Sequence, residues 1–271
     1  MDPSFLALLK CPECSTTGFH RASTPRRLAC EACGREYEGS EGYFDLLDPA
    51  EHRDLAAMSP EQRLMESELV ANLYERLWRP TFVRIMAGSG ASAGAGGFPG
   101  ELFIHKNCLA MEHQVGPWLD LSCGPGLFAR AMAAAAPGAL VVGLDISRAM
   151  LEVAHRRVKG YTNVKLVRAD AHDLPFADGQ FAGVNNSGAL HAYDDPGEAF
   201  AEVLRVLRPG GLYVASTFAS STSLFGRFAA RIAGIRRFDP PELQSQLSRI
   251  GFSDYEEIRL GDAFIFKARK P

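Results

Sequence analysis

The sequence predicts an α/β protein with a parallel sheet, preceded by a small metal-binding domain. Short apolar segments of strand length alternate with helical segments over residues 119–218, which is typical of a sheet with helices on both faces. Further on, residues 255–260 and 263–268 form two strands joined only by Gly261 and Asp262, so they must make an antiparallel hairpin. Two Cys-x-x-Cys pairs near the N-terminus predict the metal-binding domain.

Composition is that of an ordinary globular protein. With 271 residues, of which 46% are apolar and 23% charged, the chain can fill one α/β domain and a smaller appendage. A formal charge of −3 gives no general attraction to phosphate backbones. No apolar run approaches the roughly 18 residues of a membrane span, and the N-terminus lacks a signal-peptide pattern. We therefore expect no membrane span and a cytoplasmic location; the oligomeric state is left open.

The first Cys-x-x-Cys pair is Cys11 with Cys14 and the second is Cys30 with Cys33, fifteen residues further on. This is zinc-ribbon spacing, because each pair turns two thiolates towards one tetrahedral ion. Four buried thiols without metal are the alternative, but so short a segment lacks a core of its own. We predict a zinc ribbon over residues 1–48 with a last short strand near Tyr43 to Leu47. Its zinc is structural, since four protein ligands fill the coordination sphere.

Residues 49–115 are predicted to form a helical linker with a flexible loop. Leucines recur at three- to five-residue spacings in a helix from Glu51 to Met86, which Pro80 ends or kinks. Two interpretations of the aromatic and basic residues near its end stay open. They pack as part of an amphipathic helix on the next domain, or Tyr74 and Arg79 close over a ligand bound there.

The stretch from Gly88 to Gly100 consists almost entirely of Gly, Ala and Ser, so it has too few apolar side chains to order itself. We predict a mobile loop, which is a lid candidate or a tolerated insertion. A helix from Glu101 to Val115 then leads into the α/β domain, residues 116–271.

This domain begins with an apolar strand, Leu119–Leu121, which runs into a glycine-rich turn at 122–126 and a helix over 127–136. The next predicted strands are 140–145, 164–169, 181–186 and 212–218, and the helices are 149–159, 196–207 and 241–250. Residues 220–238 mix apolar side chains with four arginines. They are a candidate cover over a substrate, or they pack as an amphipathic helix.

A strand that leads through a glycine turn into a helix brings backbone N–H groups and the positive helix end to one point, which suits a nucleotide-like ligand. Ligands of parallel sheets bind at the carboxyl ends of the strands. The candidates there are Gly124, Asp145, Asp170 and Asn186, one after each successive strand. Asp145 is placed to accept both hydroxyls of a ribose. The alternative role, capping the next helix, suits Ser147 better.

The next strand is followed by Asp170 and Ala171. The carboxylate could accept an adenine amino group while the small Ala171 leaves room for the ring. The alternative is an ordinary turn aspartate.

Four motifs occur in the order typical of one enzyme family: LDLSCGPG, VVGLDIS, RADAHDLPFADGQF and LRVLRPGGLYVAST. In these motifs the region from Trp118 to about Lys270 resembles the class I S-adenosylmethionine (SAM)-dependent methyltransferases, with a domain of the ubiquinone and menaquinone type. The zinc knuckles followed by Tyr-Glu-Arg-x-Trp-Arg and Gly-Phe-Pro-Gly resemble a subgroup found in bacteria and plastids. Zinc-ribbon 23S rRNA guanine methyltransferases are similar in layout.

The resemblance implies a Rossmann-like sheet of seven strands, the last antiparallel to its neighbours, and a site for SAM. At matching positions it implies Asp120, Gly124 and Gly126 for the methionine part, Asp145 for the ribose, and Asp170 with Ala171 for the adenine. The further cofactor-binding candidates are Tyr74, Ser122, Ile146 and Asn186. Cys123 stands where the family often has glycine, which need not disturb backbone contacts.

The segment from Asn185 to Tyr193 lies where the donor methyl group points. It lacks the Asn/Asp-Pro-Pro-Tyr/Phe motif that holds a planar base nitrogen, so methylation of adenine, cytosine or glutamine nitrogen in that manner is not expected. His191 is a candidate general base for a hydroxyl or an acidic carbon, and a wall-packing role is equally compatible. Tyr193 is a second catalytic candidate. Alignment of the reactants alone can also suffice.

We therefore predict SAM-dependent O- or C-methylation of a small-molecule acceptor, in secondary metabolism or quinone-like biosynthesis. One alternative is an rRNA guanine methyltransferase whose zinc ribbon docks on RNA, supported by Arg21, Arg26 and Arg27 and by the arginines of 220–238. No aromatic and basic platform for stacking bases is evident, however. A third hypothesis is a regulatory protein that binds SAM without catalysis.

Overall fold

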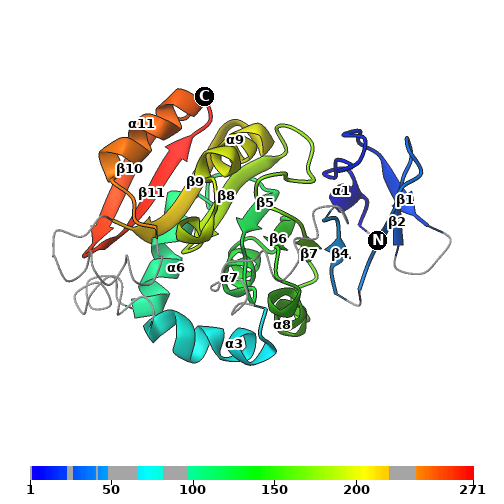
Figure 1. The fold of residues 1–271 in the computed structure, drawn as a ribbon, viewed down its shortest axis with the longest axis horizontal. Helices are drawn as coiled ribbons and strands as arrows, with labels where there is room; N and C mark the ends of the chain where they lie inside the picture. Colours follow the sequence, from blue (N-terminus) through cyan, green and yellow to red (C-terminus); the bar gives the residue numbers. More distant parts are fainter. Residues whose placement is uncertain (1, 23–26, 41, 48–65, 82–96, 220–235) are drawn as a thin grey trace.

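The structure is a computed structural model that describes residues 2–22, 27–40, 42–47, 66–81, 97–219 and 236–271 (Figure 1). Three predicted segments lie outside these residues: most of the helix before residue 66, the loop over 88–96, and residues 220–235. The described part contains an eight-stranded sheet and, at one end, a separate three-stranded sheet (Figure 1).

The large sheet has the order β10-β11-β9-β8-β5-β6-β7-β4. Its strands are β4 (Phe44–Asp45), β5 (Trp118–Leu121), β6 (Val141–Asp145), β7 (Val164–Arg168), β8 (Phe181–Ser187), β9 (Leu207–Phe218), β10 (Ser253–Leu260) and β11 (Ala263–Arg269). Neighbouring strands from β4 to β9 pair in parallel, whereas β11 is antiparallel to both β9 and β10. The predicted hairpin is therefore confirmed. Chain order reverses beside β5, which places the ligand-binding edge at the ends of β5 and β8.

Two strands differ from the prediction. The sheet has one strand more than seven, because Phe44 pairs with Val167 and Asp45 with Arg168 at the sheet edge, so the segment expected to finish the ribbon extends the large sheet instead. Strand β9 begins at Leu207 and so includes the Arg-Pro-Gly-Gly stretch, where the Gly211 carbonyl accepts a hydrogen bond from the Lys270 N–H at 2.9 Å.

Helices cover both faces of the large sheet. They are α7 (Leu127–Ala135), α8 (Arg148–Val158), α9 (Pro196–Val206) and α11 (Pro240–Ile250). Alternate side chains of β5 enter different apolar clusters: Leu119 joins the cluster of Phe200 on α9, and Trp118 joins the cluster of Met132 on α7. This two-sided burial explains why the central strands read as continuous apolar runs.

The N-terminal region contains α1 (Pro3–Leu6) and an antiparallel sheet of β1 (Phe19–Arg21), β2 (Arg27–Cys30) and β3 (Glu36–Glu38). It docks on the loop after β7, where Leu9 bridges to Phe176 and the Lys10 N–H donates to the Pro175 carbonyl at 3.0 Å. Phe5 and Leu9 are fully buried in the same apolar cluster as Phe176. The ribbon and the α/β domain therefore share a core.

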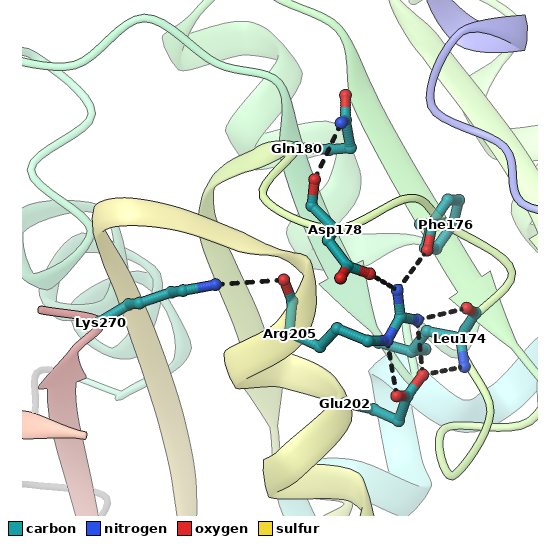
Figure 2. A network of polar contacts seen from close by, with 7 residues as sticks. All are labelled: Leu174, Phe176, Asp178, Gln180, Glu202, Arg205 and Lys270. Atoms are coloured by element: carbon teal, nitrogen blue, oxygen red, sulfur yellow. Dashed lines mark hydrogen bonds and ion pairs between the residues drawn. The ribbon is translucent and has the colours of Figure 1, made fainter. Parts of the chain in front are cut away.

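The loop after β7 is also held from its other side (Figure 2). The guanidinium of Arg205 on α9 donates to the carbonyl oxygens of Leu174 and Phe176 at 2.8 and 2.6 Å, and it forms ion pairs with Glu202 and Asp178 (Figure 2). A charged donor that satisfies two loop carbonyls fixes a segment that has no regular structure of its own.

A helical segment before the α/β domain packs over α8. It consists of α3 (Glu68–Leu73) and the π-helical turn η2 (Tyr74–Trp78), and its carboxylate Glu75 pairs with Arg130 and Arg157, each at 2.7 Å. Residues 79–81 are still helical, so the distortion lies before Pro80 rather than at it.

Helix α6 spans Gly97–Cys108. The last four residues of the predicted loop, 97–100, are thus helical. The helix ends at Cys108, seven residues earlier than expected, since Ala110 takes a φ of +53°. Among the residues that the structure describes, no helix combines the length and apolar character needed to cross a membrane.

Replacing Asp45 by Asn should lower the free energy of unfolding by about 2–4 kcal/mol, because Arg168 would stay charged and buried without its carboxylate partner. The Asp45–Arg168 ion pair is 3.0 Å long, and the Arg168 side chain is only 8% exposed. Urea unfolding measures the loss. The matched control is Arg148→Met, which removes the other partner of Asp45; that side chain is 55% exposed, so the loss should stay within about 1 kcal/mol. Equal effects of the two substitutions would contradict the assignment.

Candidate functional site

The glycine turn joins β5 to α7 at the carboxyl edge of the sheet. Ser122, Gly124 and Gly126 have φ angles of +54°, +52° and +81°, so the backbone enters the left-handed region at every second residue. Glycine adopts this conformation without steric cost. At Gly126 space is also short, because a Cβ would lie 3.3 Å from the Cβ of Ala154 on α8. The turn therefore requires small residues where the motif has them.

Asp145 ends β6 with its carboxylate directed at this turn. Oδ2 accepts a hydrogen bond from the Gly124 N–H at 2.7 Å, and Oδ1 accepts one from the Ser147 N–H at 2.9 Å. Burial raises the pKa of Asp145 to about 6. Ser147 caps α8, its Oγ accepting from the Met150 N–H at 3.2 Å. Asp145 is thus free of the capping role, and ribose binding stays its predicted function.

A pocket opens beside the turn. Tyr74 of η2 lies over it, with ring Cε1 3.9 Å from the position of a Cβ on Gly124. In an α-helix, residues five apart point about 140° away from each other. In the π-helical turn the Arg79 N–H donates to the Tyr74 carbonyl, so these two side chains lie about one turn apart and on the same side. The pocket is lined by Tyr74, Arg79, Asp120, Ser122, Cys123, Gly124, Pro125, Leu127, Phe128 and Ser187.

Asp120 of β5 is the buried acid of the pocket wall. Its Oδ1 accepts a hydrogen bond from Asn185 Nδ2 at 2.7 Å, and Asn185 is its register partner in β8. The Asn185 Oδ1 lies 2.6 Å from Nδ1 of His105 on α6. Burial raises the pKa of Asp120 to about 7, and its Oδ2 has no hydrogen-bond partner among the described residues. A buried acceptor of this kind is suited to a charged ligand group.

Sequence reasoning missed His105. Burial lowers the pKa of His105, so the ring is neutral, and we assign the proton to Nδ1 because Asn185 Oδ1 is an acceptor. The one signal for it was its spacing of four residues from Glu101, which places both on one face of a helix.

Asp170 and Ala171 follow β7 as predicted. The Asp170 Oδ1 accepts from the His172 N–H at 2.9 Å and lies 2.6 Å from His172 Nδ1. Ala171 is buried. Ile146, the candidate after β6, is half-buried and its carbonyl accepts from Arg168 Nε at 2.9 Å. These contacts give the loop its shape, while the adenine contacts stay predictions.

Tyr193 is brought to the glycine turn, whereas His191 is not among the residues that line the pocket. Asn186 Nδ2 donates to the Tyr193 hydroxyl at 2.7 Å, and the hydroxyl oxygens of Tyr193 and Ser122 lie at hydrogen-bond distance, 2.8 Å apart. Burial raises the pKa of Tyr193, so it stays protonated at neutral pH. Its contacts suit a positioning role. The His191 ring packs 5.5 Å from that of Phe218.

A second group that sequence reasoning missed surrounds Arg79. The Arg79 Nη2 forms an ion pair with Glu101 Oε1 at 2.6 Å and donates to Ser187 Oγ at 2.8 Å. The same Glu101 oxygen accepts from Ser187 Oγ at 2.9 Å and from Ser216 Oγ at 3.3 Å. Helix α6 and the ends of β8 and β9 thus meet at one buried carboxylate.

The four predicted metal ligands come together in the ribbon. Their sulfurs all lie within 4.8 Å of one another, with Cys11 and Cys33 3.8 Å apart and Cys14 and Cys30 3.6 Å apart. A tetrahedral zinc site with sulfur ligands has sulfur–sulfur distances of about 3.8 Å. The cluster could therefore hold one structural zinc ion. None of the four forms a disulfide.

The residues at the turn fit SAM. The unpartnered Oδ2 of Asp120 could accept a hydrogen bond from its ammonium group, the start of α7 suits its carboxylate, and Asp145 reaches the turn where the ribose is expected. When bound, SAM supplies an electrophilic methyl group. The Ser122 hydroxyl at this turn is held by its hydrogen bond with Tyr193.

Because the pKa of Asp120 is raised, we predict that the free energy of unfolding depends on pH and that Asp120→Asn removes this part of the dependence. Between pH of about 4 and about 7 the unfolded carboxyl is ionised while the buried one keeps its proton. The contribution of Asp120 to the free energy of unfolding is thus fully present below about pH 4. It is lost as the pH rises from about 4 to about 7, by up to about 4 kcal/mol. Urea unfolding at several pH values measures the free energy of unfolding. Parallel curves for wild type and variant would refute the assignment.

The thiol cluster predicts that Cys14→Ser loses bound zinc and unfolds at a lower temperature, because the remaining three thiolates leave the coordination sphere incomplete. Elemental mass spectrometry of the purified protein measures the metal. Cys108→Ser is the matched control, since this half-buried thiol of α6 lies outside the cluster. Full zinc content in Cys14→Ser would argue against the site.

Known proteins place the chain in a family. Residues 119–215 match the family described as "Methyltransferase domain". A chloroplastic methyltransferase of Arabidopsis thaliana is 35% identical over 257 residues, which are 89% of this chain and 70% of the relative. A demethylmenaquinone methyltransferase of Clavibacter sepedonicus is 45% identical over 102 residues, 38% of this chain and 41% of that enzyme.

Among solved structures, geranyl diphosphate C-methyltransferase from Streptomyces coelicolor A3(2) has a TM-score of 0.56 at 17% identity, covering 64% of this chain and 76% of that one. At this identity the likeness shows a shared fold. The glycine turn after β5, the acid that ends β6 and the antiparallel β11 are those that the resemblance implied. Together with the identity along most of the chain, they show that this protein belongs to the class I SAM-dependent methyltransferases.

Proposed function

We propose that this methyltransferase methylates an oxygen or carbon atom of a small, quinone-like or similarly apolar molecule. The observation that carries the proposal is the covering of the site: Tyr74 and Arg79, from one helical segment, line the same pocket as Gly124. An acceptor must pass beneath this segment to reach a donor bound at the glycine turn. Such a pocket suits a small molecule better than a folded polymer.

The names of two similar proteins support this acceptor class. The Clavibacter enzyme is named for demethylmenaquinone and the Streptomyces enzyme for geranyl diphosphate, and both are small molecules. The ribbon arginines give RNA binding little support, because Arg27 is ion-paired with Glu36 and Glu38 at 3.1 and 2.8 Å. Arg237 likewise lies 3.5 Å from Asp262.

RNA methylation and non-catalytic SAM binding stay predictions. Arg26 and the first two arginines of 220–238 lie outside the described residues, and RNA methylation is therefore a second arm of the assay below. SAM binding without catalysis is a further outcome of that assay. The cytoplasmic location also stays a prediction, since the Arabidopsis relative is chloroplastic by name.

In the proposed reaction the protein binds and orients SAM and the acceptor, and it does not supply a strong base. Asp120 would hold the ammonium group of SAM, and Asp145 would hold its ribose. Tyr193 would fix the Ser122 hydroxyl. Methyl transfer from a sulfonium is favourable, so alignment with the acceptor is the main requirement.

Asp145→Ala should weaken SAM binding about 10- to 100-fold, because two hydrogen bonds to a charged acceptor are lost. Isothermal calorimetry measures the affinity. Glu256→Ala on β10 is the control, as its side chain is 67% exposed and far along the sheet from the turn. An unchanged affinity in Asp145→Ala would mean that the ribose lies elsewhere.

Transfer itself is measured as S-adenosylhomocysteine release with demethylmenaquinone analogues reduced to the quinol and with an rRNA hairpin. Turnover with the quinol and none with the hairpin supports the proposal. The reverse pattern supports RNA methylation, and cofactor binding without any release supports a regulatory role.

A further inference from the structure

His105 of α6 lies at the far end of a buried chain of hydrogen bonds that leads to the pocket. His105, Asn185 and Asp120 are 1%, 0% and 2% exposed. Nδ1 of His105 lies 2.6 Å from Asn185 Oδ1, and Asn185 Nδ2 donates to Asp120 Oδ1 at 2.7 Å. In the described part of the chain Asp120 lines the pocket, whereas His105 and Asn185 are not among the lining residues. His105 can therefore act on a bound ligand through the other two.

Packing alone does not account for a histidine at position 105. The ring centre lies 5.0 Å from that of Phe128, a contact that an apolar side chain could also make. The second ring nitrogen, Nε2, is buried and has no hydrogen-bond partner among the described residues. A buried nitrogen without a partner costs free energy that leucine would not cost. The polar contact that distinguishes histidine from leucine here is the one between Nδ1 and Asn185.

A donor bound at Asp120 fixes the protons along the chain. To serve as counter-charge for the ammonium group of SAM, Asp120 must be ionised, and an ionised carboxylate accepts hydrogen bonds without donating any. Asn185 must therefore turn Nδ2 towards Asp120 and Oδ1 towards His105. Because an amide oxygen is also an acceptor, the neutral ring of His105 must carry its proton on Nδ1. Both hydrogen bonds then run towards Asp120, and its Oδ2 is left for the ligand.

We propose that His105 is a positioning residue for the methyl donor: through the amide of Asn185 it holds Asp120 as the acceptor for the ammonium group of SAM. This inference goes beyond the proposed function, because it concerns the donor and is independent of the acceptor. An apolar side chain at position 105 would leave Asn185 Oδ1 buried without a donor. The amide could then turn over and present its oxygen to a protonated Asp120, which is no counter-charge for an ammonium group.

The pKa of Asp120 reflects opposing influences. Burial raises it most, to about 7, and the charge of Asp145 raises it too, whereas the hydrogen bond from Asn185 and the charge of Arg79 lower it. The neighbouring Cys123 stays a neutral thiol, since burial raises its pKa well above the ordinary value. The contribution of Asn185 depends on which way its amide faces. Loss of His105 should therefore raise the pKa of Asp120 further.

Two charged groups face His105 itself. Burial lowers the pKa of His105 most, Glu101 on the same helix raises it, and Arg79 lowers it. The balance keeps the ring neutral, so His105 serves as a single N–H donor to Asn185 and adds no charge beside Asp120.

The test compares S-adenosylhomocysteine with methylthioadenosine, which has the adenosine and the sulfur but neither the amino nor the carboxyl group. Isothermal calorimetry on the full-length protein at neutral pH measures both affinities. His105→Leu should weaken binding of S-adenosylhomocysteine about 10-fold and leave that of methylthioadenosine unchanged. His105→Asn should restore most of the loss, because its amide can donate from nearly the position of Nδ1.

The pH profile of binding provides a second measurement. The ratio of the S-adenosylhomocysteine affinity to the methylthioadenosine affinity isolates Asp120, because Asp145 at the expected ribose site affects both ligands. In wild type this ratio should rise as Asp120 ionises and level off above about pH 7. In His105→Leu the midpoint of the rise should lie about one pH unit higher.

Two control variants separate this role from a structural one. Ile104→Ala removes apolar packing from α6 beside His105, so it should lower the unfolding temperature and leave the ratio of affinities unchanged. Asp120→Asn removes the carboxylate itself. It should reduce the affinity for S-adenosylhomocysteine at least as much as His105→Leu does, and abolish the rise of the ratio with pH.

Nitrogen NMR of wild type tests the same proton without a destabilising substitution, which covers the case in which His105→Leu does not fold. With S-adenosylhomocysteine bound, the ring of His105 should be protonated on Nδ1, its signals being identified by their absence in His105→Asn. A proton on Nε2 instead would overturn the inference.

Three binding results would also overturn it: equal losses for both ligands in His105→Leu, an unchanged ratio in that variant, or an unchanged affinity for S-adenosylhomocysteine in Asp120→Asn. Failure of the proposed function is distinguishable from these results. It appears as absence of methyl transfer to the quinol while the ratio of affinities still depends on His105.

Discussion

The donor site depends on one hydrogen bond, between the Asp145 carboxylate at the end of β6 and the backbone of the turn that follows β5. Asp145 holds the Gly124 N–H at 2.7 Å, and in doing so it joins the ends of β5 and β6. The turn after β5 has positive φ angles at Ser122, Gly124 and Gly126; glycine adopts them without steric cost, so Ser122 is the residue of the three that departs from its own backbone preference. Tyr193 adds a bond to Ser122 from the segment after β8. These hydrogen bonds thereby join the carboxyl ends of three neighbouring strands, β8, β5 and β6.

Charged groups hold the covering segment in place over this surface. Glu75 pairs with Arg130 and Arg157, and Arg79 pairs with Glu101. Because the π-helical turn η2 is wider than an α-helical turn, the side chains of Tyr74 and Arg79 lie on the same side of it. One helical segment therefore contributes both an aromatic ring and a cation to the pocket.

The zinc ribbon connects to the site through ordinary packing. Its chain bonds to the loop after β7 at Pro175, and Arg205 holds the same loop from the α9 side. That loop carries Asp170, the predicted adenine contact. Strand β4 adds a second connection, since Asp45 neutralises Arg168 at the sheet edge. Loss of the metal should therefore loosen the adenine end of the site as well as the ribbon.

By itself, the sequence determined the features that depend on local spacing. The cysteine pairs, the glycine turn, the acid at the end of β6 and the hairpin around Gly261 are each specified within a few residues, and the structure confirms them as elements. Burial of both faces made the central strands readable as apolar runs.

Contacts between distant segments were decided by the tertiary structure alone. Phe44 joins a sheet whose neighbouring strand is more than a hundred residues away, and Glu101 of α6 meets Arg79, Ser187 and Ser216 from three other segments. Such pairings leave no periodic signal in the sequence, because each partner follows only the pattern of its own element. For the same reason the sequence did not show that Tyr193 is buried and hydrogen-bonded to Ser122 and Asn186, contacts that suit a positioning role.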